Sequence, residues 1–384
     1  MKLNHFIFCF LLIIGNYSLA QNVGNIANNP DFFPIAVWLQ SPSNAEAYKA
    51  HGVNMYVGIW GGLNQEKLDV LKKAGMKVIC DQNDFGLKNL NEPTIYAWMH
   101  GDEPDNAQWN KAEKKYDPCI DPAKIINSYN EIKKNDPSRP VYLNLGQGVA
   151  HISYKGRGAC TGNIDSYKVS TNGYLKGCDI ASFDIYPVNS NYPEISGNLW
   201  YVAAGIDNLF EWTDHSKPVW CWIETTKYGD KNPRKPTPSE VKSEIWMALI
   251  HGANGYGFFC HTFTKNPPAD EAAFLHDSEM ISATKEYNLQ VTSLSRVLNS
   301  PSTKGYATVS SSNKEIPIDI MTKNQGGANY IFSVAMRPGQ TTAVFNITSG
   351  KNVEVIGENR TIKVKNGKFT DDFSDYAVHL YKIK

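Results

Sequence analysis

The chain has 384 residues, and its 38 Lys and Arg balance its 38 Asp and Glu, so the formal net charge is zero. This balance excludes the basic excess of a large nucleic-acid binder. The aromatic share of 12% excludes a disordered chain. The length suffices for a large core and a second domain.

Residues 1–20 have the pattern of a secretory signal peptide, with Lys2 before an apolar run over 6–14 and small residues up to Ala20. The alternative is a membrane anchor, but a spanning helix needs about 20 apolar residues. No other stretch is long and apolar enough to cross a bilayer. We therefore expect cleavage near Ala20 and a secreted or periplasmic protein. Cleavage also removes Cys9 and leaves six cysteines.

An even number of cysteines in an exported chain permits disulfides. Cys119 and Cys160 lie in segments rich in Gly, Pro and Asp, so we expect these two to pair first. Cys80, Cys221 and Cys260 lie in apolar strand-like runs, which favours buried thiols. No Cys-x-x-Cys spacing occurs, so no zinc site is expected.

Between residues 33 and 298, apolar segments alternate with segments of helical periodicity. Strands are expected at 33–38, 55–60, 77–80, 95–99, 141–144, 180–186, 219–223 and 255–260. Helices are expected at 45–51, 65–74, 122–135, 200–212, 239–251 and 274–298. Eight strands that mostly alternate with helices predict an α/β fold, a (β/α)8 TIM barrel over 21–300. An open doubly wound sheet is the alternative, but no GxGxxG turn follows the first strand.

Residues 301–384 have a different pattern, with short apolar segments separated by turn residues. Strands are expected at 306–309, 330–334, 342–345, 353–355 and 378–381. This pattern predicts a small C-terminal antiparallel β-sandwich. Within the barrel, residues 146–176 form a long irregular stretch, of the kind that is usually functional or an insertion.

In a (β/α)8 barrel the active site lies at the carboxyl ends of the strands. Carboxylates there perform acid/base chemistry, amides bind hydroxyl groups and aromatic rings stack on sugars. The candidate residues at these ends are Trp38, Trp60, Gln82, Asp102, Glu103, Asn144, Asp184, Tyr186, Trp222, Glu224 and His261.

Glu103 and Glu224 stand out because they follow the fourth and seventh strands. Glu103 has an alternative as a helix-start acid in an Asp-Glu-Pro turn. Glu224 has one as the partner of Lys227 or Arg234. For Asp184, a supporting role through hydrogen bonds agrees with the sequence as well as a catalytic role does.

With these residues in place, the chain resembles the "4/7" clan of retaining (β/α)8 glycoside hydrolases. The resemblance implies that Glu103 is the acid/base, that Glu224 is the nucleophile and that Tyr186 lies near the nucleophile. The closing segment 369–381 is similar to the end of the β-sandwich that many such enzymes carry. The implied activity is cleavage of a polysaccharide by an exported, endo-acting, retaining enzyme, expected to be a monomer.

One departure from the clan concerns its usual Asn-Glu pair, which is Asp102-Glu103 here. In the clan this Asn contacts the sugar 2-hydroxyl, so the substrate at that position is either substituted or unusual. A second option makes Asp184 one of the two working carboxylates. Some barrel hydrolases of sulfated fucans share this size and a secretory signal.

Two other classes of function remain open. A non-catalytic carbohydrate-binding barrel would use the same aromatic rings, although paired carboxylates favour an enzyme. A metal-dependent hydrolase would need clustered His and Asp, for which His100 with Asp102 or Asp81 is the candidate. We expect no metal, no cofactor and no nucleic-acid partner.

Overall fold

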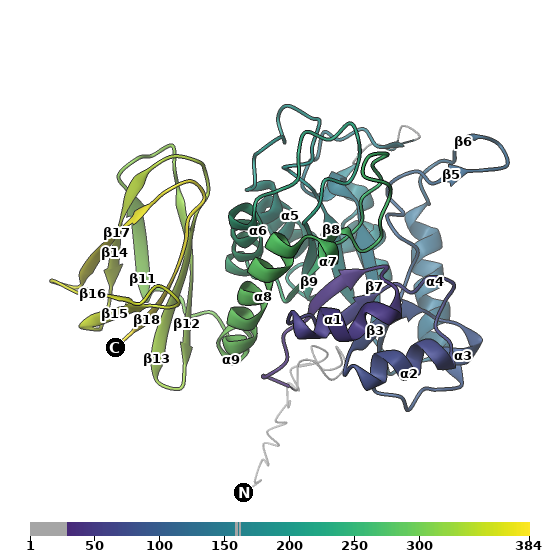
Figure 1. Cartoon of the computed structure of the whole chain (residues 1–384), viewed down its shortest axis with the longest axis horizontal. Coiled ribbons are helices and arrows are strands. Elements are labelled where there is room, and N and C mark those ends of the chain that lie inside the picture. Colours follow the sequence, from purple (N-terminus) through teal and green to yellow (C-terminus); the bar gives the residue numbers. More distant parts are fainter. Residues whose placement is uncertain (1–28, 158–159, 161–162) are drawn as a thin grey trace, which may run out of the picture.

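A computed structural model describes residues 29–157, 160 and 163–384. Eight parallel strands close into a barrel in the order β1-β2-β3-β4-β7-β8-β9-β10, with β10 paired back to β1, which confirms the predicted TIM barrel (Figure 1). The barrel strands are β1 (Ile35–Trp38), β2 (Met55–Val57), β3 (Lys77–Asp81), β4 (Ile95–Met99), β7 (Val141–Leu145), β8 (Ile180–Asp184), β9 (Val219–Glu224) and β10 (Gly255–Phe259).

Helices follow most of the strands and surround the barrel. The α-helices are α1 (Ala45–Ala50), α2 (Gln65–Lys73), α3 (Asp84–Leu87), α4 (Pro122–Asn135), α5 (Tyr201–Trp212), α6 (Pro238–Ile250), α7 (Ala273–His276), α8 (Ser278–Ser293) and α9 (Ser295–Leu298). Short 3₁₀ helices are η1 (Pro42–Asn44), η2 (Gln147–Val149), η4 (Ile164–Ser166), η5 (Val169–Thr171) and η6 (Tyr174–Gly177).

The single helix predicted over 274–298 is three helices. Asp277 has an extended backbone, and its side chain accepts a hydrogen bond from the N–H of Met280. An Asp in this position is a helix N-cap, which ends α7 and starts α8. The sequence pattern had shown only the shared apolar face.

Alternation along the strands divides the side chains between two layers. Tyr142, Trp220 and Trp222 point into the barrel, where they form an inner core with residues of the other strands. Their neighbours along the chain pack outward against the helices. A Cβ atom on Gly257 would lie 2.1 Å from the ring of Trp222, so this large ring fits only because β10 carries glycine there.

The C-terminal part is a sandwich of two antiparallel sheets, as predicted. One sheet has the order β11-β14-β17, with β11 (Ala307–Ser311), β14 (Thr341–Ile347) and β17 (Lys368–Phe373). The other has the order β12-β13-β18-β15-β16, with β12 (Ile318–Gln325), β13 (Ala328–Ala335), β18 (Val378–Ile383), β15 (Asn352–Val355) and β16 (Arg360–Lys363).

Strands β12, β16 and β17 of the sandwich were absent from the prediction. In β12, Lys323 occupies a buried position and its ammonium group donates to the carbonyls of Leu298 and Ser300. A lysine inside a strand obscures the apolar pattern, although backbone carbonyls replace water around it.

The sandwich packs against the barrel through α6, and the two share one continuous core. Trp246 of α6 contacts Phe332 of β13, with ring centroids 5.2 Å apart. His251 at the end of α6 lies between Asp207 of α5 and Asp319 of β12, at 2.9 and 3.1 Å. Figure 1 shows the sandwich on this side of the barrel.

Cys119 and Cys160 form a disulfide, as predicted, and Cys80, Cys178, Cys221 and Cys260 are buried thiols. The expected signal peptide lies outside the described residues. Among the helices that the structure describes, none combines the length and the apolar character needed to cross a membrane.

Candidate active site

Three carboxyl groups meet at the mouth of the barrel. Asp184 ends β8, while Asp102 and Glu103 follow β4. The side-chain amide of Asn144 in β7 donates to Asp102 at 2.9 Å and to Asp184 at 3.2 Å. Glu103 is electrostatically coupled to Asp184, because its charge contributes to the raised pKa of Asp184. We call Asp102, Glu103 and Asp184 the mouth acids.

Strand alternation explains why Asn144 can bridge two of the mouth acids. Asn144 lies two residues after Tyr142, and Asp184 lies four residues after Ile180, so both point into the barrel as Tyr142 and Ile180 do. Strand β7 pairs with β8, which brings the two side chains close together. Ser182, also inward, donates its hydroxyl to the Asn144 carbonyl at 2.9 Å. This bond fixes the amide with its N–H₂ group toward the acids.

Glu103 has a left-handed backbone, with φ at 44°. Its N–H donates to the carbonyl of Asn144 at 3.1 Å, and its own carbonyl accepts from the N–H of Asn106 at 3.0 Å. Such a conformation costs a non-glycine residue about 1–3 kcal/mol and is concentrated at functional sites. The chain beyond β4 thus turns sharply to aim this side chain into the mouth.

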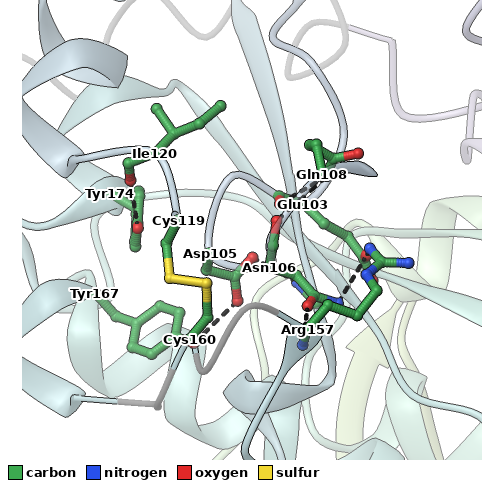
Figure 2. The surroundings of a disulfide bond; sticks show 11 residues. Glu103, Asp105, Asn106, Gln108, Cys119, Ile120, Arg157, Cys160, Tyr167 and Tyr174 are labelled. Atoms are coloured by element: carbon green, nitrogen blue, oxygen red, sulfur yellow. Dashed lines mark hydrogen bonds and ion pairs between the residues drawn. A yellow bond between two sulfur atoms is a disulfide. The ribbon is translucent and has the colours of Figure 1, made fainter. Parts of the chain in front are cut away.

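Arg157 supplies the positive charge beside the mouth acids. Its guanidinium donates to Glu103 at 2.7 Å, and the amide of Asn106 donates to the same Glu103 oxygen at 3.1 Å. The Asn106 carbonyl in turn accepts from the backbone N–H of Arg157 at 3.0 Å. Figure 2 shows these residues beside the Cys119–Cys160 bridge, which ties the two loops together.

Two of the mouth acids, Asp102 and Asp184, have raised pKa values. Burial and the neighbouring charges of Glu103 and Asp102 raise the pKa of Asp184 well above its usual range. Desolvation of its carboxyl by surrounding protein, together with Glu103, raises the pKa of Asp102 to about 7, although the residue as a whole is exposed. The raised pKa of Asp184 favours its protonated form, whereas the ion pair with Arg157 favours the carboxylate of Glu103.

Asp105, missed in the sequence, lies behind this group. It accepts hydrogen bonds from the N–H of Gly146 and the hydroxyl of Tyr167, both at 2.9 Å. Burial raises its pKa to about 6. The run Asp-Glu-Pro-Asp was visible in the sequence, but nothing there distinguished the solvent-facing acid from the buried one.

Aromatic rings surround the mouth. Tyr186 lies against Tyr228, with ring centroids 5.7 Å apart, and burial raises the pKa of both hydroxyls. Trp60 is 53% exposed and Phe263 is 60% exposed, and both rings pack against His261. Exposed rings of this kind offer faces for stacking.

Glu224 is separated from the mouth acids in its contacts. Its side chain is buried, and its oxygens accept from the N–H of Val188 at 2.6 Å and from the N–H and amide of Asn189 at 2.9 and 2.6 Å. Its remaining neighbour is the carboxyl of Glu244 in α6, which is fully buried. Burial raises the pKa of Glu224 to about 7 and that of Glu244 far above its usual range.

Glu244 was also missed, although the sequence held a signal for it. It is an acid on a helix whose other residues from Val241 to Ile250 are almost all buried. The expected alternative partner of Glu224, Arg234, instead pairs with Glu240 at 2.6 Å. We call Glu224 and Glu244 the buried acid pair.

Of the other predicted residues, His261, Trp38 and Trp222 lie inside the barrel or beneath its rim, whereas Gln82 does not. His261 is buried beneath the rim and contacts Gln40, while Trp38 and Trp222 pack edge to face at 4.9 Å inside the barrel. Gln82 lies away from the mouth acids, because both ends of its amide bond to α4, at Ile132 and Asn135.

The proposed metal alternative does not form through His100. Its ring nitrogens face the carbonyl of Gly177 at 2.8 Å and the hydroxyl of Ser128 at 3.3 Å, and not Asp102 or Asp81. Over the described residues, no three His, Cys, Asp or Glu side chains are grouped as a metal ion would require.

Two surface hollows lie elsewhere. One, of about 480 Å³, is lined by Asp207, Phe210, Glu211, His215, His251 and Gly252. The other, of about 440 Å³, belongs to the sandwich around Gly326 and Lys382. Neither hollow is lined by a mouth acid, so the size of a hollow does not indicate the reaction site in this protein.

Solved structures of glycoside hydrolases have similar folds. AmyP in complex with maltotriose aligns with a TM-score of 0.53 at 10% identity, over 93% of this chain and 98% of that one. The maltogenic α-amylase AmyB from Thermotoga neapolitana gives 0.49 at 11% identity, over 93% and 99%. The GH51 α-L-arabinofuranosidase from Thermotoga petrophila gives 0.49 at 10% identity, over 90% of each chain.

The chain shares the fold of AmyP. No family model matches the sequence, and no curated protein sequence matches it. At 10% identity the similarity concerns the barrel and its appended sandwich, so the chemistry must be argued from the residues themselves.

Proposed function

We propose that the chain is a glycoside hydrolase whose working carboxyl groups are Glu103 and Asp184. The observation that carries the proposal is the grouping of both residues around Asn144, whose side-chain amide donates to Asp184 and whose backbone carbonyl accepts from Glu103. This group lies at the carboxyl ends of the barrel strands, where barrel enzymes hold their active sites. Two carboxyls of which only one is protonated are what glycosidic cleavage requires. The shared fold with AmyP, which binds maltotriose, supports the same class of bond.

The roles follow from where the proton lies. Asp184 would donate its proton to the leaving glycosidic oxygen, while the Glu103 carboxylate attacks the anomeric carbon. The glycosyl–Glu103 ester would then be hydrolysed by a water molecule that Asp184 deprotonates. Inverting enzymes hold their carboxyls about 6.5–9.5 Å apart and retaining enzymes about 5–5.5 Å. The grouping of Glu103 and Asp184 around Asn144 favours the shorter separation and therefore retention.

This assignment departs from the one implied by the 4/7 resemblance. Glu224 would need a free oxygen to attack, yet both of its oxygens accept hydrogen bonds and its side chain is 1% exposed. We propose that Glu224 is a positioning residue that orders the segment 187–190 beyond Tyr186. The option of Asp184 as a working carboxylate is the one that the geometry favours.

The proposed substrate is a polysaccharide, cut internally. Trp60 and Phe263 extend the aromatic surface of the rim away from the acids, as a polymer rather than a small glycoside would need. We also propose that the protein acts outside the cytoplasm, since the Cys119–Cys160 disulfide is typical of an oxidising compartment.

The test is release of reducing ends by the purified protein from a panel of plant and marine polysaccharides, with NMR of the first product. The proposal expects one or more polymers to be cut with retention of the anomeric configuration, and no release by the Glu103→Gln variant. Binding to polymers without release by the wild type would instead favour a non-catalytic carbohydrate-binding barrel.

A further inference from the structure

A small hairpin of β5 (Trp109–Asn110) and β6 (Lys115–Tyr116) leaves the barrel a few residues after Glu103 and projects from it (Figure 1). Trp109 and Tyr116 are direct partners across the two strands, with ring centroids 5.1 Å apart and planes at 74°. They are 52% and 44% exposed. Directly opposed residues lie on the same face of a hairpin, so the rings form one aromatic edge.

The tip of the hairpin has a defined shape. The Asn110 carbonyl accepts from the N–H groups of Ala112 and Glu113 at 3.0 and 3.1 Å, and its amide donates to Asp117 at 3.1 Å. These bonds fix the turn between the two aromatic residues. The exposed rings are thus presented by an ordered segment, which reduces the entropy lost on binding.

The base of the hairpin is attached to the mouth acids. The amide of Gln108 donates to the backbone carbonyls of Asp102 and Glu103 at 3.2 and 3.4 Å. On the other side, Ile120 donates its N–H to Pro104 at 2.9 Å, next to the Cys119 disulfide. A polymer on the hairpin would therefore lie at a fixed place relative to Glu103.

The hairpin is also basic. The exposed Lys111, Lys114 and Lys115 outnumber two acids, the exposed Glu113 and the partly buried Asp117 at the base. Glu113 pairs with Lys115 at 2.6 Å. Among the residues that the structure describes, no acid forms an ion pair with Lys111 or Lys114, so the tip carries uncompensated positive charge.

We propose that the β5–β6 hairpin binds a chain of an anionic polysaccharide. The sugar rings would stack on Trp109 and Tyr116, while sulfate or carboxylate groups would pair with Lys111 and Lys114. The inference rests on the proposed function in that the same polymer would continue to Glu103 and Asp184. The binding step itself needs no hydrolysis, so it can be tested separately.

The test is affinity electrophoresis of the full chain in native gels containing dextran sulfate, polygalacturonate, or neutral dextran. We expect both anionic polymers, or one of them, to retard the wild type more than dextran does, which also separates sulfate from carboxylate recognition. Trp109→Ala with Tyr116→Ala should weaken this binding at least tenfold. Lys111→Gln with Lys114→Gln should weaken it at low salt and much less at high salt.

Three controls keep the outcomes distinct. Leu289→Ala removes an equally exposed apolar side chain on α8 and should bind as the wild type does. Trp109→Phe should restore most of the binding lost in Trp109→Ala. Glu103→Gln should bind the polymers although it fails to cut, so loss of hydrolysis and loss of the hairpin site are separable.

The proposal is overturned if the Trp109→Ala, Tyr116→Ala double variant binds as tightly as the wild type. It is also overturned if neither anionic polymer retards the wild type more than dextran does. Sedimentation of the protein with phosphatidylserine vesicles, in the absence of polymer binding, would assign the hairpin to a membrane surface instead.

Discussion

Asp102 and Asp184 of the mouth acids resemble the buried acid pair in having raised pKa values, but the two groups differ in their surroundings. The mouth acids have a cation, Arg157, and a bridging amide, Asn144, and they meet solvent at the barrel opening. In the buried acid pair, Glu224 is held by the backbone N–H groups of Val188 and Asn189, and the side chains of both acids are almost inaccessible. A raised pKa marks burial in both groups, whereas accessibility and a charge partner mark only the first as a reaction centre.

The largest effect is expected from Glu103→Gln. Loss of the carboxylate removes the proposed nucleophile and the partner of Arg157. A positioned acid or base contributes about 10²–10⁴-fold, and loss of the nucleophile should reduce hydrolysis by at least that much. Initial rates of reducing-end release measure this, and an unchanged melting temperature would show that the fold is intact. A folded variant with wild-type rates would remove the mouth acids from the chemistry.

The buried acid pair should respond in stability. Glu224→Leu leaves the N–H groups of Val188 and Asn189 without their acceptor. Each buried donor left unpaired costs about 1–3 kcal/mol, so for two donors the free energy of unfolding measured in urea should fall by roughly 2–6 kcal/mol. Glu224→Gln retains an acceptor oxygen and is the matched control, with a smaller shift. Equal stability of Glu224→Leu and wild type would contradict the structural role.

The disulfide should affect the mouth acids and not the buried acid pair, because it holds the loop of Arg157 beside the mouth acids. Cys119→Ser with Cys160→Ser should lower the free energy of unfolding by about 2–4 kcal/mol and reduce hydrolysis as Arg157 loses its fixed position. Reducing agent should reproduce this loss in the wild type and leave the double variant unaffected. If reduction changes neither stability nor rate in the wild type, the bridge has no such part.

The smallest effect concerns His251, between barrel and sandwich. Hydrogen bonds with Asp207 and Asp319 raise its pKa to about 9. Because the folded pKa is raised, the added stability is complete below about pH 6.5 and disappears as pH rises through 9. Both acids are substantially exposed, so solvent screening leaves about 1–2 kcal/mol. Urea unfolding across pH 6–10 should show this slope, and His251→Gln should flatten it; a parallel slope in the variant would exclude His251.

The sequence was sufficient for the barrel, since strands buried on both faces appear as apolar runs between helical segments. It also located Glu103 and Asp184, because strand ends converge in this fold. The direction of the Glu224 side chain depended on donors from Val188 and Asn189, which are 36 and 35 residues away in the chain. Arg157 was visible only as one loop cation, because the contacts that bring it to Glu103 are tertiary.

The most direct measurement compares kcat/KM of Asp184→Asn and Glu224→Gln on the same polysaccharide, with melting temperatures as the control for folding. The account predicts that Asp184→Asn loses at least about 10²-fold, the lower range for a proton donor, while Glu224→Gln stays within tenfold of the wild type. A folded but inactive Glu224→Gln beside an active Asp184→Asn would contradict it and assign the reaction to Glu103 and Glu224.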